Sequence, residues 1–323
     1  MKRKSCMVLR IGAAALLCFV MVFSSCDMLT GADGKDGNDG KDGGQAAAIY
    51  EKLTVSNAAA LASGFAGLAE KYSPDDKIEA TVTLAAGFDF AGLSAEIDTT
   101  VESFQITGTD PVNGLFTAIG ADNIYVHYDF SASGWTGLDS GGDGVPFFLD
   151  TTDIGENADA LAEVNLNAVR PHRNQILSIV MPAAIVAVGD YLFYDLQGLQ
   201  KVSFAGCGNL TTINSYAFAA ASFNNTALTD ISFDGCTKLS YIGDYAFLYS
   251  ANLRGSNGTT TLDLSAIDVP LLTIRDYAFF RAGGNGAMKS VKLPGGGWFG
   301  NNAFVRNMGL ESVWITDGRW GEL

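Results

Sequence analysis

Ile242-Gly-Asp-Tyr-Ala-Phe247 is one of five related six-residue phrases that recur between residues 188 and 304. The phenylalanines that close the phrases lie 25, 29, 32 and 25 residues apart. A unit of this length cannot bury its own apolar face, so it must stack on further copies of itself, which predicts a solenoid. The other four copies are Val188-Gly-Asp-Tyr-Leu-Phe193, Ile213-Asn-Ser-Tyr-Ala-Phe218, Ile274-Arg-Asp-Tyr-Ala-Phe279 and the more divergent Phe299-Gly-Asn-Asn-Ala-Phe304.

A second pattern, with the period of a β-strand, precedes each copy. Apolar residues occupy positions one, four and six of a short run, and side chains alternate along a strand, so positions four and six face inward. The fourth copy follows an insertion at 254–260 and keeps only the end of the run. We therefore expect a parallel ladder of strands over a continuous core. The runs contain Ile176, Ile179 and Met181; Leu199, Val202 and Phe204; Leu228, Ile231 and Phe233; Leu262 and Leu264; Met288, Val291 and Leu293; and Leu310, Val313 and Ile315.

These two patterns together resemble the BspA-type leucine-rich repeat of bacterial cell-surface proteins. Met181-Pro182 and Leu293-Pro294 match one form of the strand exit, and the Gly-Cys pairs at Cys207 and Cys236 match another. The resemblance covers 175–316 and departs at the insertion and at Gly295-Gly-Gly297. It implies an α/β solenoid dominated by β-structure, a leucine-rich repeat with a parallel strand ladder. We assign these repeats to residues 176–323.

The N-terminus has the features of an export signal. Four cations lie within its first ten residues, and the apolar stretch 11–23 is too short for a typical membrane span. The sequence Ser24-Ser25-Cys26 resembles a bacterial lipobox, which implies cleavage after residue 25 and lipidation of Cys26. Phe23 is atypical for a lipobox, so ordinary secretion with a spare cysteine remains an alternative. The Gly-x-y triplets within 26–45 lack proline, which favours a charged, glycine-rich tether over a collagen-like helix.

Residues 46–175 allow two interpretations. Asn57 is a good N-cap for a helix that reaches Tyr72, before the stop at Ser73-Pro74. Gly- and Asp-rich turns separate the strand-like runs that follow. We expect degenerate repeats with an N-terminal helical cap, and the alternative is a separate α+β region. The runs are 77–84, 103–107, 123–130 and 161–169.

The charge of the chain excludes one class of partner. The formal net charge is −15, and the first 25 residues carry four cations and no anion, so their removal would leave −19. Such a field repels phosphate backbones, which argues against nucleic-acid binding. We expect no cofactor. Calcium binding is the weaker alternative, because the loops at 139–144 and 150–153 are acidic but do not fit the Asp-x-Asx-x-Asx-Gly calcium loop.

Catalytic motifs are missing from the sequence. It holds two histidines, His127 and His172, neither with a metal-ligand partner at the usual spacing, and no phosphate loop or nucleophile elbow. We therefore predict that the protein is not an enzyme. The basic cluster at 170–173 is expected to be a solvated turn. Cys207 and Cys236 occupy equivalent positions in adjacent coils, where side-by-side buried thiols are favoured over a disulfide.

The outward positions of the strand pattern are two, three and five, and they form the predicted binding surface. Trp314 is the best anchor, because tryptophan is enriched at interface hot spots; cover from the following C-terminal segment is the alternative. The tyrosines of the recurring phrase, Tyr191, Tyr216, Tyr245 and Tyr277, are expected to stack as a structural column. The predicted binding residues are Lys201, Ser203, Asp230, Asp263, Lys292 and Trp314.

Two functional hypotheses follow from the sequence. The resemblance implies a non-enzymatic, lipid-anchored bacterial surface protein whose solenoid binds a host extracellular-matrix protein, a glycan or a bacterial surface partner. It would be a monomer that touches the membrane only through its N-terminal lipid, at the outer membrane and cell surface rather than on the periplasmic side. The alternative is a structural or antigenically variable envelope lipoprotein without a specific ligand.

Overall fold

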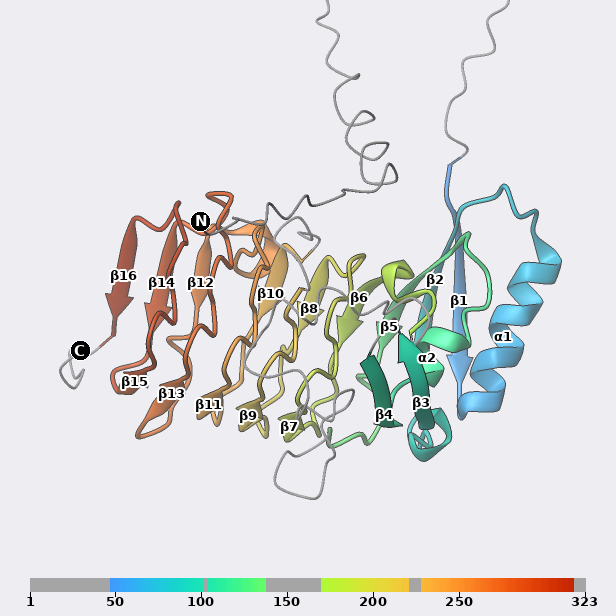
Figure 1. The fold of residues 1–323 in the computed structure, drawn as a ribbon, viewed down its shortest axis with the longest axis horizontal. Helices are drawn as coiled ribbons and strands as arrows, with labels where there is room; N and C mark the ends of the chain where they lie inside the picture. Colours follow the sequence, from blue (N-terminus) through green and yellow to red (C-terminus); the bar gives the residue numbers. More distant parts are fainter. Residues whose placement is uncertain (1–46, 102–103, 138–169, 221–227, 317–323) are drawn as a thin grey trace, which may run out of the picture. The chain divides into compact units, whose positions relative to one another are not determined.

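The repeats wind into coils whose two long sides are parallel ladders of strands, seen in the computed structural model (Figure 1). The structure describes residues 47–101, 104–137, 170–220 and 228–316. All pairings in the first ladder are parallel, and its strand order follows the chain, β1-β2-β5-β6-β8-β10. The bounds are β1 Ile49–Val55, β2 Ile78–Leu84, β5 Ile124–Asp129, β6 Ile176–Val180, β8 Lys201–Ser203 and β10 Asp230–Ser232.

Two further parallel sheets complete the coils. The strands β12 (Thr261–Asp263), β14 (Ser290–Leu293) and β16 (Ser312–Ile315) continue the first side of the solenoid. The second ladder lies on the other side of the coils and has the order β15-β13-β11-β9-β7 (Figure 1). Its strands are β7 Ala187–Val188, β9 Thr212–Ile213, β11 Tyr241–Ile242, β13 Leu272–Ile274 and β15 Gly297–Phe299.

The core between the two ladders consists of the residues that the repeat pattern places inward. Val202, Phe204 and Leu262 are completely buried, and their counterparts in coils one to five are at most 6% exposed. The phenylalanines that close the recurring phrase stack from coil to coil, with ring centroids 5.4, 5.5, 4.9 and 5.0 Å apart. The predicted parallel ladder and its continuous core are therefore confirmed.

The last coil departs from this pattern. Val313 and Ile315, predicted to face a closed core, are 52% and 41% exposed. Their strand, β16, is the last of its sheet, with β14 on one side. Among the described residues no strand pairs with its other side, so the inward side chains are covered from one direction only.

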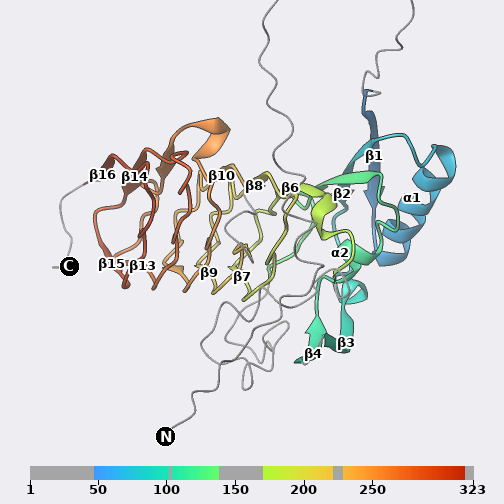
Figure 2. The ribbon, with the colours of Figure 1, turned by 45° about the horizontal axis from the view of Figure 1, so that its top comes forward.

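The N-terminal region pairs directly with the repeats. β1, β2 and β5 belong to the same parallel ladder as β6. The predicted helix is confirmed as α1 (Ala58–Lys71), in which the backbone N–H of Ala60 donates to Oδ1 of Asn57 at 2.8 Å. Figures 1 and 2 show α1 beside β1 at the end of the ladder, where Leu61, Phe65 and Leu68 bury its apolar face.

Short elements fill the connections between these strands. β3 (Ala95–Val101) and β4 (Phe104–Asp110) form an antiparallel hairpin, which the sequence pattern predicts in part through the run 103–107. The remaining short helices are α2 (Gly114–Thr117) and the 3-10 turns η1 (Ala91–Leu93), η2 (Arg173–Gln175) and η3 (Ser256–Gly258). The predicted strand at 161–169, the signal peptide, Cys26 and the tether lie outside the described residues. No helix of the described part is long and apolar enough to cross a membrane.

The recurring Asp-Tyr pair forms a turn that ties each coil to the next. The tyrosines at 191, 216, 245 and 277 have φ between 54° and 56°, in the left-handed region that L-residues seldom adopt. Each donates its backbone N–H to a carbonyl of the next coil, as Tyr245 does to Asp276 at 3.1 Å. Their rings stack with centroids 4.7, 4.9 and 5.0 Å apart, so the predicted tyrosine column is confirmed.

Candidate binding surface

The outward side chains of β6, β8, β10, β12, β14 and β16 form a surface that we call the strand face. The register of the ladder places Lys201 opposite Asp230 and Lys292 opposite both Asp263 and Trp314. All six predicted binding residues thus lie in cross-strand register positions, since Ser203 is opposite Val180 and Ser232. The half-buried hydroxyl of Ser203 accepts a hydrogen bond from the backbone N–H of Ala205 at 3.3 Å.

Four of the predicted residues pair as salt bridges at the surface, and of the four side chains only that of Asp230 is mostly covered, at 17% exposed. Lys292 Nζ lies 3.0 Å from Oδ2 of Asp263, and Lys201 Nζ lies 3.8 Å from Oδ2 of Asp230. Burial opposes ionisation of Asp263, yet hydrogen bonds from Ser265 and Lys292 hold the pKa of its carboxyl below the ordinary value. Exposed pairs of this kind contribute only ~0–1 kcal/mol, so their charges stay available to a partner at little cost.

The strand face is divided into two patches, whereas the sequence pattern predicts one continuous column. The first sheet ends at β10 and the next begins at β12, because the insertion at 254–260 lies between them and includes η3. Instead of a further strand, the backbone of Arg254 forms an isolated parallel β-bridge with that of Asp230. Lys201 and Asp230 therefore lie in an N-terminal patch, while Asp263, Lys292 and Trp314 form a C-terminal patch.

Trp314 is the most prominent apolar group of the C-terminal patch. It is 62% exposed, so the described residues do not cover it. Its indole Nε1 donates to Oγ of Ser312 at 3.1 Å, which orients the ring on the strand. A second salt bridge, from Lys289 to Glu311 at 2.9 Å, borders the patch.

The N-terminal strands extend the strand face beyond the repeats, which sequence reasoning missed. Register links six outward residues into one row that crosses the whole first sheet. His127 Nδ1 lies 2.8 Å from Oγ of Ser178, and its Nε2 lies 3.7 Å from Oε2 of Glu79. The alternation of 78–84 could have revealed this face, but not its register. The row is Lys52, Thr81, His127, Ser178, Lys201 and Asp230.

Comparison with protein families identifies the repeat. The description "BspA type Leucine rich repeat region" matches residues 172–282 and 219–318, with 6 copies. Residues 172–318 are a BspA-like leucine-rich repeat region. Repeats of this family indicate a role in protein interaction, and the family is generally non-enzymatic.

Comparison with solved structures finds a match to another leucine-rich repeat protein. A crystal structure of a leucine-rich repeat protein from Bacteroides ovatus is 13% identical to the BspA-like protein, with a TM-score of 0.19. The match covers 46% of this chain and 58% of that chain, so the protein spans little more than half the length of this relative. A search of curated proteins finds no match.

The basic cluster that precedes the BspA-type repeats is not a solvated turn, which corrects the sequence prediction. Arg170 is completely buried and Arg173 is 5% exposed. Arg170 pairs with Asp110, and Arg173 Nη2 lies 3.0 Å from Oδ2 of Asp195. Both partners are distant in sequence, so the pattern around residue 170 carries no sign of them. These cations hold the fold together and do not belong to the strand face.

The two cysteines of the repeats are buried, free thiols. Cys207 Sγ lies 3.4 Å from the carbonyl of Pro182, and Cys236 Sγ lies 3.3 Å from that of Phe204. Burial raises the pKa of Cys207 to about 11 and that of Cys236 to about 12. Neither thiol is a candidate nucleophile. Among the described residues no group of three His, Cys, Asp or Glu side chains could hold a metal, and the acidic loops at 139–144 and 150–153 lie outside them.

Proposed function

We propose that this BspA-like protein is a lipid-anchored bacterial surface protein whose strand face binds a protein partner. The partner would be a host extracellular-matrix protein or a protein on another bacterial surface. The observation that carries this proposal is the C-terminal patch, where the exposed indole of Trp314 lies beside the Lys292–Asp263 pair.

The chemistry of the patch suits a protein partner. Tryptophan buries a large area on binding, and a rim of opposite charges gives specificity and a faster association rate. Because the strands are held by a parallel ladder, few backbone degrees of freedom are lost when a partner binds. The weak salt bridges can exchange partners, and the apolar ring supplies most of the affinity.

Anchoring rests on the N-terminal sequence alone. Cleavage after residue 25 would leave Cys26 as the lipidated residue, and a glycine-rich tether of n residues spans ~5–6 Å × √n. The tether would hold the solenoid a few nanometres from the bilayer. A lipid of several acyl chains anchors stably, because each buried CH₂ contributes ~0.8 kcal/mol.

Biolayer interferometry of the purified protein against a panel of extracellular-matrix proteins tests the binding proposal. We expect saturable binding to at least one of them that is lost in the triple variant Lys201→Ala/Lys292→Ala/Trp314→Ala. The matched control is Lys238→Ala/Arg306→Ala/Trp298→Ala, which removes two cations and one tryptophan outside the strand face and should bind normally. Binding that is unchanged in the triple variant would favour a structural envelope protein without a specific ligand for the strand face.

Protease treatment of intact cells tests the location. We expect immunodetection of the repeats to fail after treatment, and the variant Cys26→Ala to leave the membrane fraction. A repeat band that survives on intact cells and disappears only after lysis would place the solenoid inside the envelope. The proposal of surface binding would then be wrong.

A further inference from the structure

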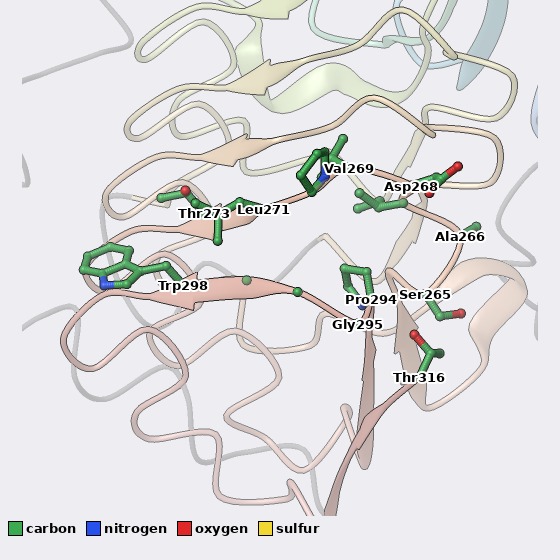
Figure 3. A pocket seen from close by; sticks show the side chains of 14 residues that line it. Ser265, Ala266, Asp268, Val269, Leu271, Thr273, Pro294, Gly295, Trp298 and Thr316 are labelled. Carbon is green, nitrogen blue, oxygen red and sulfur yellow. The ribbon is translucent and has the colours of Figure 1, made fainter. Parts of the chain in front are cut away.

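A pocket of about 890 Å³ opens between the fourth and fifth coils, away from the strand face. Figure 3 shows its two sides, one formed by the connection from β12 to β13 and the other by the connection from β14 to β15. Its volume is within the ~300–1,000 Å³ typical of small-molecule sites. Nothing in the proposed function uses this pocket.

The pocket exists because two adjacent coils turn their corners with different lengths of chain. Ten positions separate Leu264 from Ile274 in the fourth coil, but only six separate Leu293 from Phe299 in the fifth. The shorter corner consists of Pro294 and Gly295-Gly-Gly297. Because three of these four residues have no side chain, they leave the longer corner beside them largely uncovered. A Cβ on Gly296 would lie 2.9 Å from the carbonyl oxygen of Pro270, which shows how closely the two corners approach.

One end of the pocket carries an exposed aromatic ring. Trp298 lies on β15 and is 45% exposed, and its neighbours across the second ladder are Thr273 and then Tyr241. The guanidinium of Arg275 lies 5.5 Å from the ring centroid of Trp298, while its Nε lies 3.6 Å from Oδ1 of Asp244. The contact between the cation and the ring fixes the indole in place before any ligand arrives.

The rest of the lining is amphipathic and lacks cations. Val269, Pro270 and Leu271 supply an apolar wall, and Leu271 is 52% exposed. The hydroxyls of Ser265 and Thr316 and the carboxylate of Asp268 supply polar atoms. Asp268 is the one charged residue of the lining, and the neighbouring Arg275 is already paired with Asp244, so the lining disfavours an anionic ligand.

We propose that this pocket binds a short, neutral oligosaccharide. A pyranose ring has an apolar face of C–H groups that packs against an aromatic ring, and a rim of hydroxyls that donate to carboxylates. Trp298 provides the platform and Asp268 the acceptor. A peptide strand is less suited to the space between these two coils, because the facing edges of β13 and β15 already pair with each other.

Saturation-transfer-difference NMR on the purified protein tests the proposal with a defined panel of neutral trisaccharides: maltotriose, cellotriose, mannotriose and triacetylchitotriose. A heparin trisaccharide serves as the anionic probe and a polyproline decapeptide as the peptide probe. We expect at least one neutral trisaccharide to bind, and its affinity to fall by about tenfold or more in Trp298→Ala. Asp268→Asn, which keeps the shape of the side chain, should weaken the same sugar without changing thermal stability.

The matched control is Trp314→Ala, which removes the exposed tryptophan of the strand face and should bind the sugar normally. Failure of all four neutral trisaccharides to bind overturns the proposal, as does a sugar affinity that is unchanged in Trp298→Ala or equally lost in Trp314→Ala. Preferential binding of the heparin probe, or binding of polyproline alone, also overturns it. Each of these results leaves the proposed protein partner of the strand face untouched, because that partner is tested with different residues.

Discussion

Asp110 and Arg170 form a completely buried ion pair that joins β4 to the start of the repeats across 60 residues of chain. Arg170 Nε donates to Oδ2 at 3.0 Å and Nη2 donates to Oδ1 at 3.3 Å, while Nη1 donates to the carbonyl of Leu192. The guanidinium also lies 4.5 Å from the ring centroid of Phe116. Burial lowers the pKa of Arg170 to about 10, and the charge of Asp110 opposes this shift.

Removal of one member of this pair should be strongly destabilising. Arg170→Met leaves a buried carboxylate without its cation, and we expect a loss of ~3–5 kcal/mol in the free energy of unfolding. The double variant Asp110→Leu/Arg170→Met removes both charges and should recover most of that loss. Urea unfolding followed by circular dichroism measures both. As a control, Lys289→Met breaks the exposed pair with Glu311 and should cost less than ~1 kcal/mol. A double variant no more stable than Arg170→Met would contradict the argument.

The glycines of the chain divide into positions that need glycine and positions that do not. A Cβ on Gly243, in the recurring phrase, would lie 2.6 Å from the backbone carbonyl carbon of Asn214 and from the nitrogen of Ser215. Gly243→Ala must therefore push two coils apart, and we expect a loss of ~1–3 kcal/mol. Gly67 lies exposed within α1 with nothing inside 4 Å of its Cβ position, so Gly67→Ala should stabilise by ~0.5–1 kcal/mol. Thermal melts of the two variants should shift in opposite directions.

The repeats could be predicted from the sequence because the same inward positions recur, and each copy confirms the others. β1 could not be predicted, because its apolar alternation is interrupted by Glu51, which accepts hydrogen bonds from Lys71 at the end of α1 and from the C-cap residue Tyr72. The exposure of Val313 has a similar reason, since a repeat pattern does not tell where stacking ends.

The outward positions of the candidate binding residues could be predicted from the sequence, but their grouping into two patches could not. The alternation of each strand identifies Lys201, Lys292 and Trp314 as outward residues. Their grouping depends on which strands pair, and the insertion at 254–260 breaks that pairing between β10 and β12. The burial of Arg170 depends on Asp110, whose position relative to the repeats is set by the fold and not by local sequence.

The aspartates of the recurring phrase should contribute to stability because the carboxylate of each accepts a backbone N–H of the next coil. Oδ1 of Asp276 accepts the backbone N–H of Asn301 in the next coil at 2.7 Å, and Asp244 accepts that of Asp276 at 2.9 Å. Asp276→Ala leaves the N–H of Asn301 without this acceptor, and we expect a loss of ~1–2 kcal/mol. Asp276→Asn keeps an oxygen in place and should lose less. Equal losses in the urea unfolding of both variants would show that the charge, not the acceptor, matters.

Alkaline pH should weaken the solenoid through its buried thiols and tyrosines. Burial raises the pKa of Cys207 to about 11 and of Cys236 to about 12, from 9.0, and it also raises the pKa of Tyr191 and Tyr216 above the ordinary value. The unfolded chain therefore loses these protons first. The stability that the neutral forms contribute is fully present below pH ~9 and is lost as the pH rises toward the folded-state values. We expect the urea midpoint to be constant from pH 7 to 8.5 and to fall by pH 10.5.

The thiol share of this effect can be separated from the tyrosine share. The double variant Cys207→Ala/Cys236→Ala is less stable at pH 7 because it leaves two small cavities, but it has no thiol to ionise. Its midpoint should therefore fall less steeply between pH 8.5 and 10.5 than that of the parent chain. Because the folded state keeps both thiols protonated and covered, dithionitrobenzoate at pH 8 should also label them far more slowly than in urea. Fast labelling of the folded chain, or a pH profile unchanged by the double variant, would contradict the burial of these two residues.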